Sequence, residues 1–127
     1  PLPAPSPDLI DGATLLLDFD GTLVPLAETP EAVSVDPGLR ALLEALRDGL
    51  GGRLAIVSGR SVATLRERFG LENFLIAGTH GLEVGAPGQA VESAAPMPEV
   101  DRAERAFEAF ARDRPGVLVE RKTLSVA

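Results

Sequence analysis

The apolar residues of the chain fall into short unbroken runs that end at polar turns. Residues 15–17 are leucines followed by Asp18, and the segments 53–57 and 74–77 have a similar apolar character. Unbroken apolar runs of this length are typical of parallel strands that are covered on both faces. The pattern therefore predicts three strands of one buried sheet.

Apolar residues between these runs recur at helical spacing. Asp36 is an expected N-cap with Pro37 at the first helical position, and Ser61 is the expected N-cap of a second helix that ends at Gly70. The order strand, helix, strand, helix, strand predicts an α/β fold, with right-handed crossovers and a parallel sheet that carries helices on both faces. The expected buried stripes are Leu39, Leu42, Leu43 and Leu46 in the first helix, and Val62, Leu65 and Phe69 in the second.

The pattern changes after Thr79. A Gly- and Pro-containing turn between 82–84 and 90–92 predicts a hairpin, and helical spacing predicts a helix over 99–112. Two short apolar segments, 117–119 and 124–126, predict two further strands.

These changes predict how the chain is organised. Four prolines within the first seven residues indicate a tail, and the small residues and prolines at 94–98 indicate a domain boundary. The chain ends inside an apolar segment, so we expect it to be part of a longer protein. The expected parts are a flexible tail (1–12), an incomplete α/β core (13–95) and the start of a second α/β domain (96–127).

Composition excludes several classes of protein. The chain has 127 residues and no cysteine, which excludes disulfide scaffolds, thiolate nucleophiles and sulfur-ligated zinc. Nineteen acidic and 12 basic residues give a formal charge of −7, which argues against nucleic acid and anionic membranes as partners. No apolar run approaches the roughly 18–20 residues that a membrane span needs, and no positively charged region leads into an apolar stretch of the secretory type. We therefore expect a cytoplasmic protein.

The strongest chemical signal is the string Asp18-Phe19-Asp20-Gly21-Thr22-Leu23, which follows the first predicted strand. Ligand sites in open parallel sheets lie beyond the carboxyl ends of the strands. Two carboxylates at this spacing repel each other unless one is protonated or a cation lies between them, and Mg²⁺ suits such oxygen ligands. A merely solvated or calcium-binding acidic loop is the alternative for a lone Asp-x-Asp pair, but the full string favours a catalytic site.

This string resembles the first motif of the haloacid-dehalogenase-like (HAD) phosphohydrolases. The resemblance implies a HAD-like, Rossmann-type core in which Asp18 is the nucleophile that forms an aspartyl phosphate. It implies that Asp20 protonates the leaving oxygen and then deprotonates the hydrolytic water. Mg²⁺ would be held by the Asp18 carboxylate and the Asp20 backbone carbonyl, and Phe19, Gly21 and Thr22 would contact the phosphate.

Ser58-Gly59-Arg60 follows the second predicted strand and resembles the second motif of the same superfamily. A hydroxyl at a helix N-terminus can bind a phosphate without further charge. An ordinary Ser-Gly turn is the alternative, but the position on the neighbouring parallel strand favours phosphate binding. We expect Ser58 and Gly59 to contact the phosphate. Arg60 is a further candidate for a phosphate contact, ranked below Ser58.

Two later segments narrow the resemblance. Gly78-Thr79-His80-Gly81-Leu82-Glu83 and Glu120-Arg121-Lys122, in this order, are similar to segments of the trehalose-6-phosphate phosphatase family. The resemblance implies that Glu120 and Lys122 lie on a cap domain and contact sugar hydroxyls; a solvated strand face is the alternative. We expect His80 and Gly81 to support the site, with His80 bracing the turn rather than transferring a proton.

The resulting hypothesis is the N-terminal part of a Mg²⁺-dependent phosphatase for a small sugar phosphate, with trehalose 6-phosphate as the first choice. Phosphatases for sucrose phosphate or mannosylglycerate phosphate, and a non-catalytic HAD-like binding or regulatory domain, are the alternatives. A lysine and acidic metal ligands that follow the cap in this family have no counterpart in the chain. We therefore expect the isolated chain to be inactive or weakly active, and to self-associate through its incomplete sheet and cap.

Overall fold

The computed structural model describes residues 3–4, 6–27, 29, 32–122 and 124–126. The chain divides into two compact units, Pro1–Val91 and Glu92–Ala127. The described residues before the first strand include a short 3-10 helix at Pro7–Ile10, for which Ser6 provides the N-cap. None of the described helices is long and apolar enough to cross a membrane.

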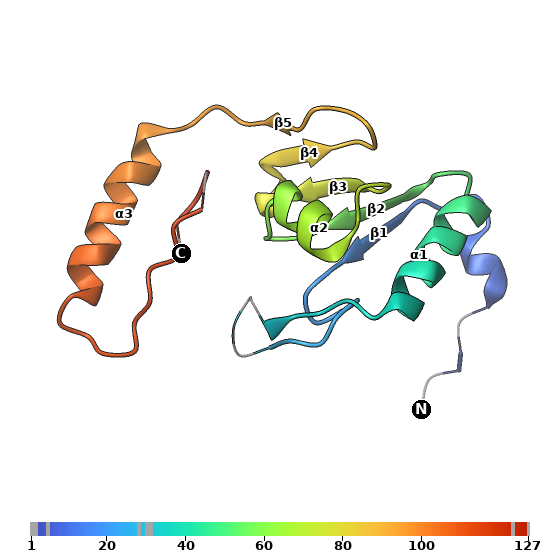
Figure 1. The fold of residues 1–127 in the computed structure, drawn as a ribbon, viewed down its shortest axis with the longest axis horizontal. Helices are drawn as coiled ribbons and strands as arrows, with labels where there is room; N and C mark the ends of the chain where they lie inside the picture. Colours follow the sequence, from blue (N-terminus) through green and yellow to red (C-terminus); the bar gives the residue numbers. More distant parts are fainter. Residues whose placement is uncertain (1–2, 5, 28, 30–31, 123, 127) are drawn as a thin grey trace. The chain divides into compact units, whose positions relative to one another are not determined.

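The sheet runs in the order β1-β2-β3-β4-β5, so each strand neighbours the one that precedes it in the sequence (Figure 1). β1 pairs with β2 and β2 with β3 in parallel, whereas β3 and β4 are antiparallel. The predicted parallel strands are thus confirmed, and the sheet as a whole is mixed. The strands are β1 (Leu15–Asp18), β2 (Leu54–Val57), β3 (Leu75–Gly78), β4 (Glu83–Gly85) and β5 (Glu92–Ser93).

Local sequence chemistry sets the bounds of the two helices in the first unit. Helix α1 (Pro37–Gly49) begins after Asp36, whose Oδ1 accepts hydrogen bonds from the backbone N–H groups of Gly38 and Leu39 at 2.7 and 3.3 Å. Helix α2 (Val62–Phe69) begins after Ser61 and ends at Gly70, which has a left-handed φ of 67°. These caps were predicted from residue type alone and are confirmed.

Both helices cover the same face of the sheet. The core contains Leu43 of α1, Leu65 of α2 and Ile56 of β2. Because the sheet advances in one direction from β1 to β2 to β3, two right-handed crossovers must place their helices on one side. The structure thus differs from the expected arrangement, in which helices flank both faces.

The opposite face of the sheet is exposed in the part of the chain that the structure describes. The strand registers place Leu16, Leu75 and Val84 on this face, and their side chains are 68%, 41% and 42% exposed. The expectation that the leucine run of β1 is buried on both sides is therefore wrong for the described residues. An unbroken apolar run does not by itself report which face is covered.

The second unit contains helix α3 (Pro98–Ala111) and a short return of the chain. Arg121 and Val126 form an isolated antiparallel bridge, and Lys122 N donates to Ser125 O at 2.8 Å. The predicted strand at 117–119 is absent, and Leu118 is exposed. A strand needs a hydrogen-bonded partner, and the bridge lies farther along the chain.

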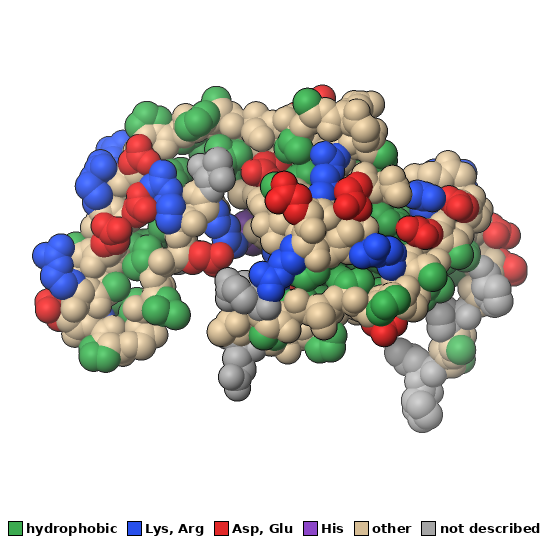
Figure 2. Space-filling model, in the orientation of Figure 1, with side chains coloured by type: hydrophobic (Ala, Val, Ile, Leu, Met, Phe, Trp, Pro, Cys, Tyr) green, Lys and Arg blue, Asp and Glu red, His purple; other side chains and the backbone are tan. Residues whose placement is uncertain are grey.

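Acidic and basic side chains lie side by side on the face of the molecule shown in Figure 2, both over α2 and over α3. The formal charge of −7 is therefore not gathered into a single acidic patch on this face.

Candidate active site

The loop after β1 places two carboxylates at the carboxyl end of that strand. Asp18 is the last residue of β1, and the Thr22 hydroxyl donates to Asp18 Oδ2 at 2.9 Å. Phe19 is buried and anchors the loop in the core. Gly21 has φ +82°, a conformation that favours glycine, and its N–H donates to Val24 O at 2.8 Å. The loop is a closed turn that leaves the Asp18 side chain exposed.

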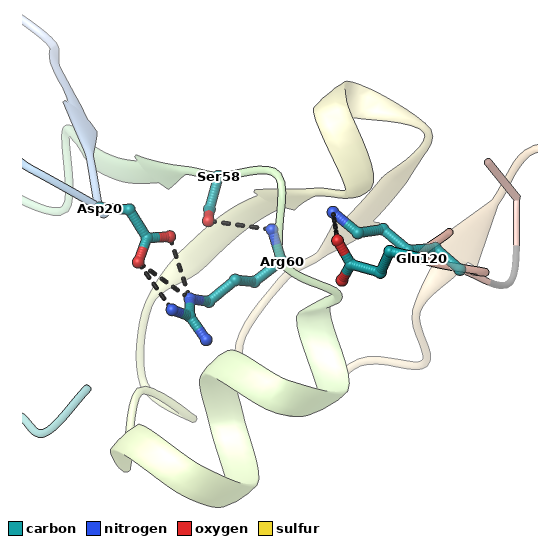
Figure 3. A network of polar contacts seen from close by, with 5 residues as sticks. Asp20, Ser58, Arg60 and Glu120 are labelled. Atoms are coloured by element: carbon teal, nitrogen blue, oxygen red, sulfur yellow. Dashed lines mark hydrogen bonds and ion pairs between the residues drawn. The ribbon is translucent and has the colours of Figure 1, made fainter. Parts of the chain in front are cut away.

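Arg60 joins this loop to the turn that follows β2. Its Nε donates to both carboxylate oxygens of Asp20, at 3.1 Å to Oδ1 and 2.9 Å to Oδ2, and its Nη2 donates to Oδ1 at 2.8 Å (Figure 3). This is the planar fork with which a guanidinium binds a carboxylate. The two motifs that the sequence analysis singled out therefore meet at the carboxyl ends of two neighbouring parallel strands.

Ser58 shapes the turn between β2 and α2. The residue is buried, its N–H donates to Ala77 O at 2.9 Å, and its Oγ accepts from Arg60 N at 3.0 Å (Figure 3). A hydroxyl that accepts in this way still carries its own hydrogen as a donor. Ser58 is thus fixed by the turn and keeps one donor for an anionic oxygen.

Two amides in the first turn of α2 already have partners within the chain. Val62 N donates to Glu83 Oε2 at 2.8 Å, and Thr64 N donates to Ser61 Oγ at 3.1 Å. Since amides at a helix N-terminus are the groups that bind anions, these two bonds leave fewer of them for a ligand than the sequence suggested.

The segment after β3 braces the Ser58 turn from the opposite side. Thr79 N donates to Arg60 O at 2.8 Å and His80 N donates to Ser58 O at 3.1 Å. Thr79 and His80 both have positive φ, 49° and 57°, which is uncommon for residues other than glycine. A Cβ on Gly59 would lie 2.6 Å from His80 Cε1, so a glycine is needed for the His80 ring to lie against the turn.

Sequence reasoning missed the parts played by Glu83 and Thr79. Both side chains are almost fully buried, and Glu83 reaches α2 from β4. Glu83 was part of the quoted Gly78–Glu83 string but was given no role of its own. The strand pattern gave no signal for this, because alternation in Leu82-Glu83-Val84 would place the apolar side chains inward and Glu83 outward, whereas Glu83 is buried and Val84 is exposed.

Glu120 and Lys122 belong to the second unit. Their side chains form an ion pair with Lys122 Nζ and Glu120 Oε2 3.6 Å apart, and Glu120 is labelled in Figure 3. The structure thus brings the predicted sugar-binding residues next to one another, and separately joins Asp18–Thr22, Ser58–Arg60 and His80 in the first unit.

The donor set after β1 is suited to a hard cation. Within the described ranges, no group of three or more His, Cys, Asp or Glu side chains is placed to hold a metal ion. Asp18 presents an exposed carboxylate at the strand end, whereas both oxygens of Asp20 accept from Arg60. A Mg²⁺ ion is satisfied by one or two carboxylates with carbonyl and water oxygens, so the residues present fit the ion, with Asp18 as the side-chain ligand.

The sequence is similar to that of a known protein family over most of its length. The model of the trehalose-phosphatase family matches residues 16–127. A probable trehalose-phosphate phosphatase from Sinorhizobium fredii is 44% identical over 126 residues, which cover 99% of this chain and 47% of that protein. The chain therefore spans about half the length of this relative.

Solved structures agree with the fold. The C-terminal domain of C. albicans trehalose-6-phosphate phosphatase matches with a TM-score of 0.75 and 27% identity, over 85% of this chain and 39% of that one. A phosphatase of the haloalkanoate (HAD) superfamily from Bacteroides thetaiotaomicron matches with a TM-score of 0.51 and 22% identity, over 87% of this chain and 39% of that one. The fold is HAD-like, and the chain belongs to the trehalose-phosphatase family.

Proposed function

We propose that this protein contributes the nucleophile and the phosphate site of a Mg²⁺-dependent phosphatase that hydrolyses a sugar phosphate. Trehalose 6-phosphate is the preferred substrate in this proposal. One observation carries the proposal. The Asp18–Thr22 loop and the Ser58–Arg60 turn meet at the carboxyl ends of neighbouring parallel strands, joined by the Asp20–Arg60 contact. This is the place where open parallel sheets bind their ligands.

In the proposed reaction, an Asp18 oxygen attacks phosphorus in line with the leaving oxygen. The bond from phosphorus to the sugar oxygen breaks, and the sugar leaves with a proton from Asp20. A water molecule then attacks the aspartyl phosphate and gives its proton to Asp20, which releases phosphate and restores Asp18. The Asp18 carboxylate and the Asp20 backbone carbonyl would hold Mg²⁺, which neutralises charge on the phosphoryl group when it is bound.

The phosphoryl group would be bound largely by neutral donors. We assign to it the Ser58 hydroxyl and the backbone of Phe19 and Gly59. The Thr22 hydroxyl and the Gly21 N–H donate to Asp18 Oδ2 and Val24 O, and they would bind the phosphoryl group by exchanging these partners. The support for this assignment is that the Ser58 hydroxyl keeps its hydrogen after accepting from Arg60 N. His80 and Gly81 would act indirectly, because the backbone N–H of His80 secures Ser58 O.

The sugar would be bound by a second domain. We propose that residues 13–95 form part of the catalytic core and residues 96–127 the start of the cap, with Glu120 and Lys122 facing sugar hydroxyls. Their ion pair supports this assignment, because it places a donor and an acceptor together, and a sugar presents hydroxyls that both donate and accept.

The proposal is tested in a chimera in which this chain replaces its matching segment in the Sinorhizobium fredii relative. Phosphate release is measured with trehalose 6-phosphate, sucrose phosphate and mannosylglycerate phosphate, with and without Mg²⁺. We expect Mg²⁺-dependent release that is fastest with trehalose 6-phosphate. Faster release from another sugar phosphate would change the substrate assignment, and a folded chimera that releases none would favour the non-catalytic alternative.

We also propose that the isolated chain self-associates through the exposed face of its sheet. Leu16, Leu75 and Val84 form an apolar surface there, and burying it would gain roughly 25 cal/mol per Å². Light scattering over a range of concentrations should show a rising mass, and a Leu16→Lys, Leu75→Lys variant should lower it. Leu118→Lys is the matched control, because Leu118 is exposed in the second unit. A monomer at every concentration would contradict this proposal.

A further inference from the structure

The Asp20 carboxylate is held in a fixed direction by Arg60. Both oxygens accept from the guanidinium, over distances of 2.8 to 3.1 Å. A bidentate pair restrains the rotation of the carboxylate as well as its position, which a single hydrogen bond or a point charge does not do.

Arg60 is itself restrained by two aromatic rings and by its backbone hydrogen bonds. Its guanidinium carbon lies 5.9 Å from the centre of the Phe19 ring and 5.3 Å from that of Phe69. These buried rings lie 4.9 Å apart, and the Arg60 side chain is 14% exposed. The backbone of Arg60 is fixed too, since its N–H donates to Ser58 Oγ and its carbonyl accepts from Thr79 N. Cation–π contacts with two buried rings restrain the Arg60 side chain.

We infer that Arg60 is a positioning residue for Asp20, which aims the carboxylate at the oxygen that gains or loses a proton. This inference rests on the proposed function. It gives Arg60 a role other than the phosphate contact that the sequence predicts. The structure directs its fork to Asp20 instead, and the phosphoryl group keeps the neutral donors of the loop and the turn.

The two roles differ in their dependence on the leaving group. A sugar oxygen needs a proton in order to leave, whereas the oxygen of an activated aryl phosphate leaves without one. A residue that positions the acid should therefore matter for the sugar phosphate alone, and a phosphate ligand should matter equally for both. The parameter kcat/KM isolates this step, because it excludes hydrolysis of the aspartyl phosphate after the leaving group has departed.

The experiment compares Arg60→Ala and Arg60→Lys in the chimera. We expect kcat/KM for trehalose 6-phosphate to fall about 10- to 100-fold in both variants, the scale of a misplaced catalytic group, and kcat/KM for an aryl phosphate to change less than about threefold. Lysine keeps the charge but lacks the fork, so it should not restore activity. In an Asp20→Ala background, Arg60→Lys should have almost no further effect, because the group that it positions is gone.

Arg47→Ala is the matched control. Arg47 also donates from Nε and Nη2 to a carboxylate, that of Asp48, and also lies over a ring, that of Phe74, but at the end of α1. Its loss should change neither rate. Equal losses on both substrates in the Arg60 variants would make Arg60 a phosphate ligand, and unchanged rates would remove it from the site. Either result overturns the inference.

A second measurement separates the inference from the proposed function. In the 127-residue chain, the ¹⁵Nε–H signal of Arg60 should be shifted and slow to exchange with solvent, and Asp20→Ala should abolish both effects. An inactive chimera with this result would overturn the phosphatase assignment and leave the contact standing. An Arg60 signal that does not respond to Asp20→Ala would overturn the positioning role even in an active enzyme.

Discussion

Two segments that carry candidate functional residues are held in opposite ways. The turn 58–60 is fixed by backbone hydrogen bonds from Thr79 and His80 and by buried groups that include Ser58. The segment 120–122 has a backbone hydrogen bond only to its own return, from Lys122 N to Ser125 O, and it is held to α3 by ion pairs of Arg121 with partly exposed carboxylates. Buried hydrogen bonds are costly to leave unsatisfied, whereas exposed ion pairs contribute little and are screened by salt.

This contrast suits the two tasks that we propose. Transfer of a phosphoryl group needs atoms held in a narrow geometry before the substrate arrives. Recognition of a sugar needs hydrogen-bonding groups, which can exchange one partner for another when the substrate binds. The following predictions test whether the first segment is rigid and the second adaptable, in order of decreasing effect.

The largest effect is expected from Asp18→Asn. An amide is a poor nucleophile and a poor Mg²⁺ ligand, so phosphate release by the chimera should fall by at least about 1,000-fold. The fold should survive, because Asp18 is exposed and an amide oxygen can still accept from the Thr22 hydroxyl. Phosphate release and thermal unfolding are measured on the same sample. Turnover close to that of the parent would remove the nucleophile assignment.

Glu83→Ala tests the buried hydrogen bond that holds the start of α2, close after the first segment. The change leaves Val62 N–H without its partner at a buried position, which should lower the free energy of unfolding by about 2 kcal/mol. Glu83→Gln keeps an acceptor and should cost less than about 1 kcal/mol. Urea unfolding of the 127-residue chain, followed by far-UV circular dichroism, measures both. Equal and small effects would mean that Glu83 does not secure the start of α2.

Glu120→Ala and Lys122→Ala test the function assigned to the second segment. Each change should raise the transition-state free energy for hydrolysis of trehalose 6-phosphate, measured from kcat/KM, by about 1–3 kcal/mol. This is the scale of a lost hydrogen bond to a charged group. Neither should alter kcat/KM for a small aryl phosphate, which has no sugar to bind. Equal losses on both substrates would show that these residues are structural, and that the segment is not a sugar site.

Much of the first unit could be predicted because its signals are local. Ser61 and Gly70 mark the ends of α2 by chemistry that each residue carries alone, and the apolar run before Asp18 locates β1. The place of the candidate site follows from these elements, since the carboxyl ends of parallel strands meet at one edge. The DxD string and the Ser-Gly turn could therefore be brought together without a structure.

The remaining features depend on contacts between distant residues. Arg60 and Asp20 are 40 positions apart, and nothing in either motif says that the guanidinium turns to the carboxylate rather than to a ligand. The burial of Glu83 beneath α2 is likewise decided by how β4 packs. The predicted strand at 117–119 failed for a related reason, because apolar character is local but strand pairing is not.

The smallest effect is expected from Arg121→Ala, which tests the second segment as a structure. Arg121 donates to Asp101 at 2.8 Å and also to Glu104, and so ties the segment to α3 through side chains that solvent reaches. Removing the Arg121 side chain should lower the free energy of opening of α3 by less than about 1 kcal/mol at low salt and by almost nothing at 1 M NaCl.

Hydrogen exchange of the α3 amides, at low and high salt, measures this cost where it arises. Arg102→Ala is the matched control, because Arg102 pairs with Glu99 within the same helix and does not involve the segment. We expect the Arg121 effect to fade with salt, whereas the effect of Glu83→Ala persists, since a buried hydrogen bond is not screened. A loss of more than about 2 kcal/mol in the free energy of opening, unchanged by salt, would mean that the second segment is held as rigidly as the first. The distinction between a rigid phosphoryl site and an adaptable sugar site would then fail.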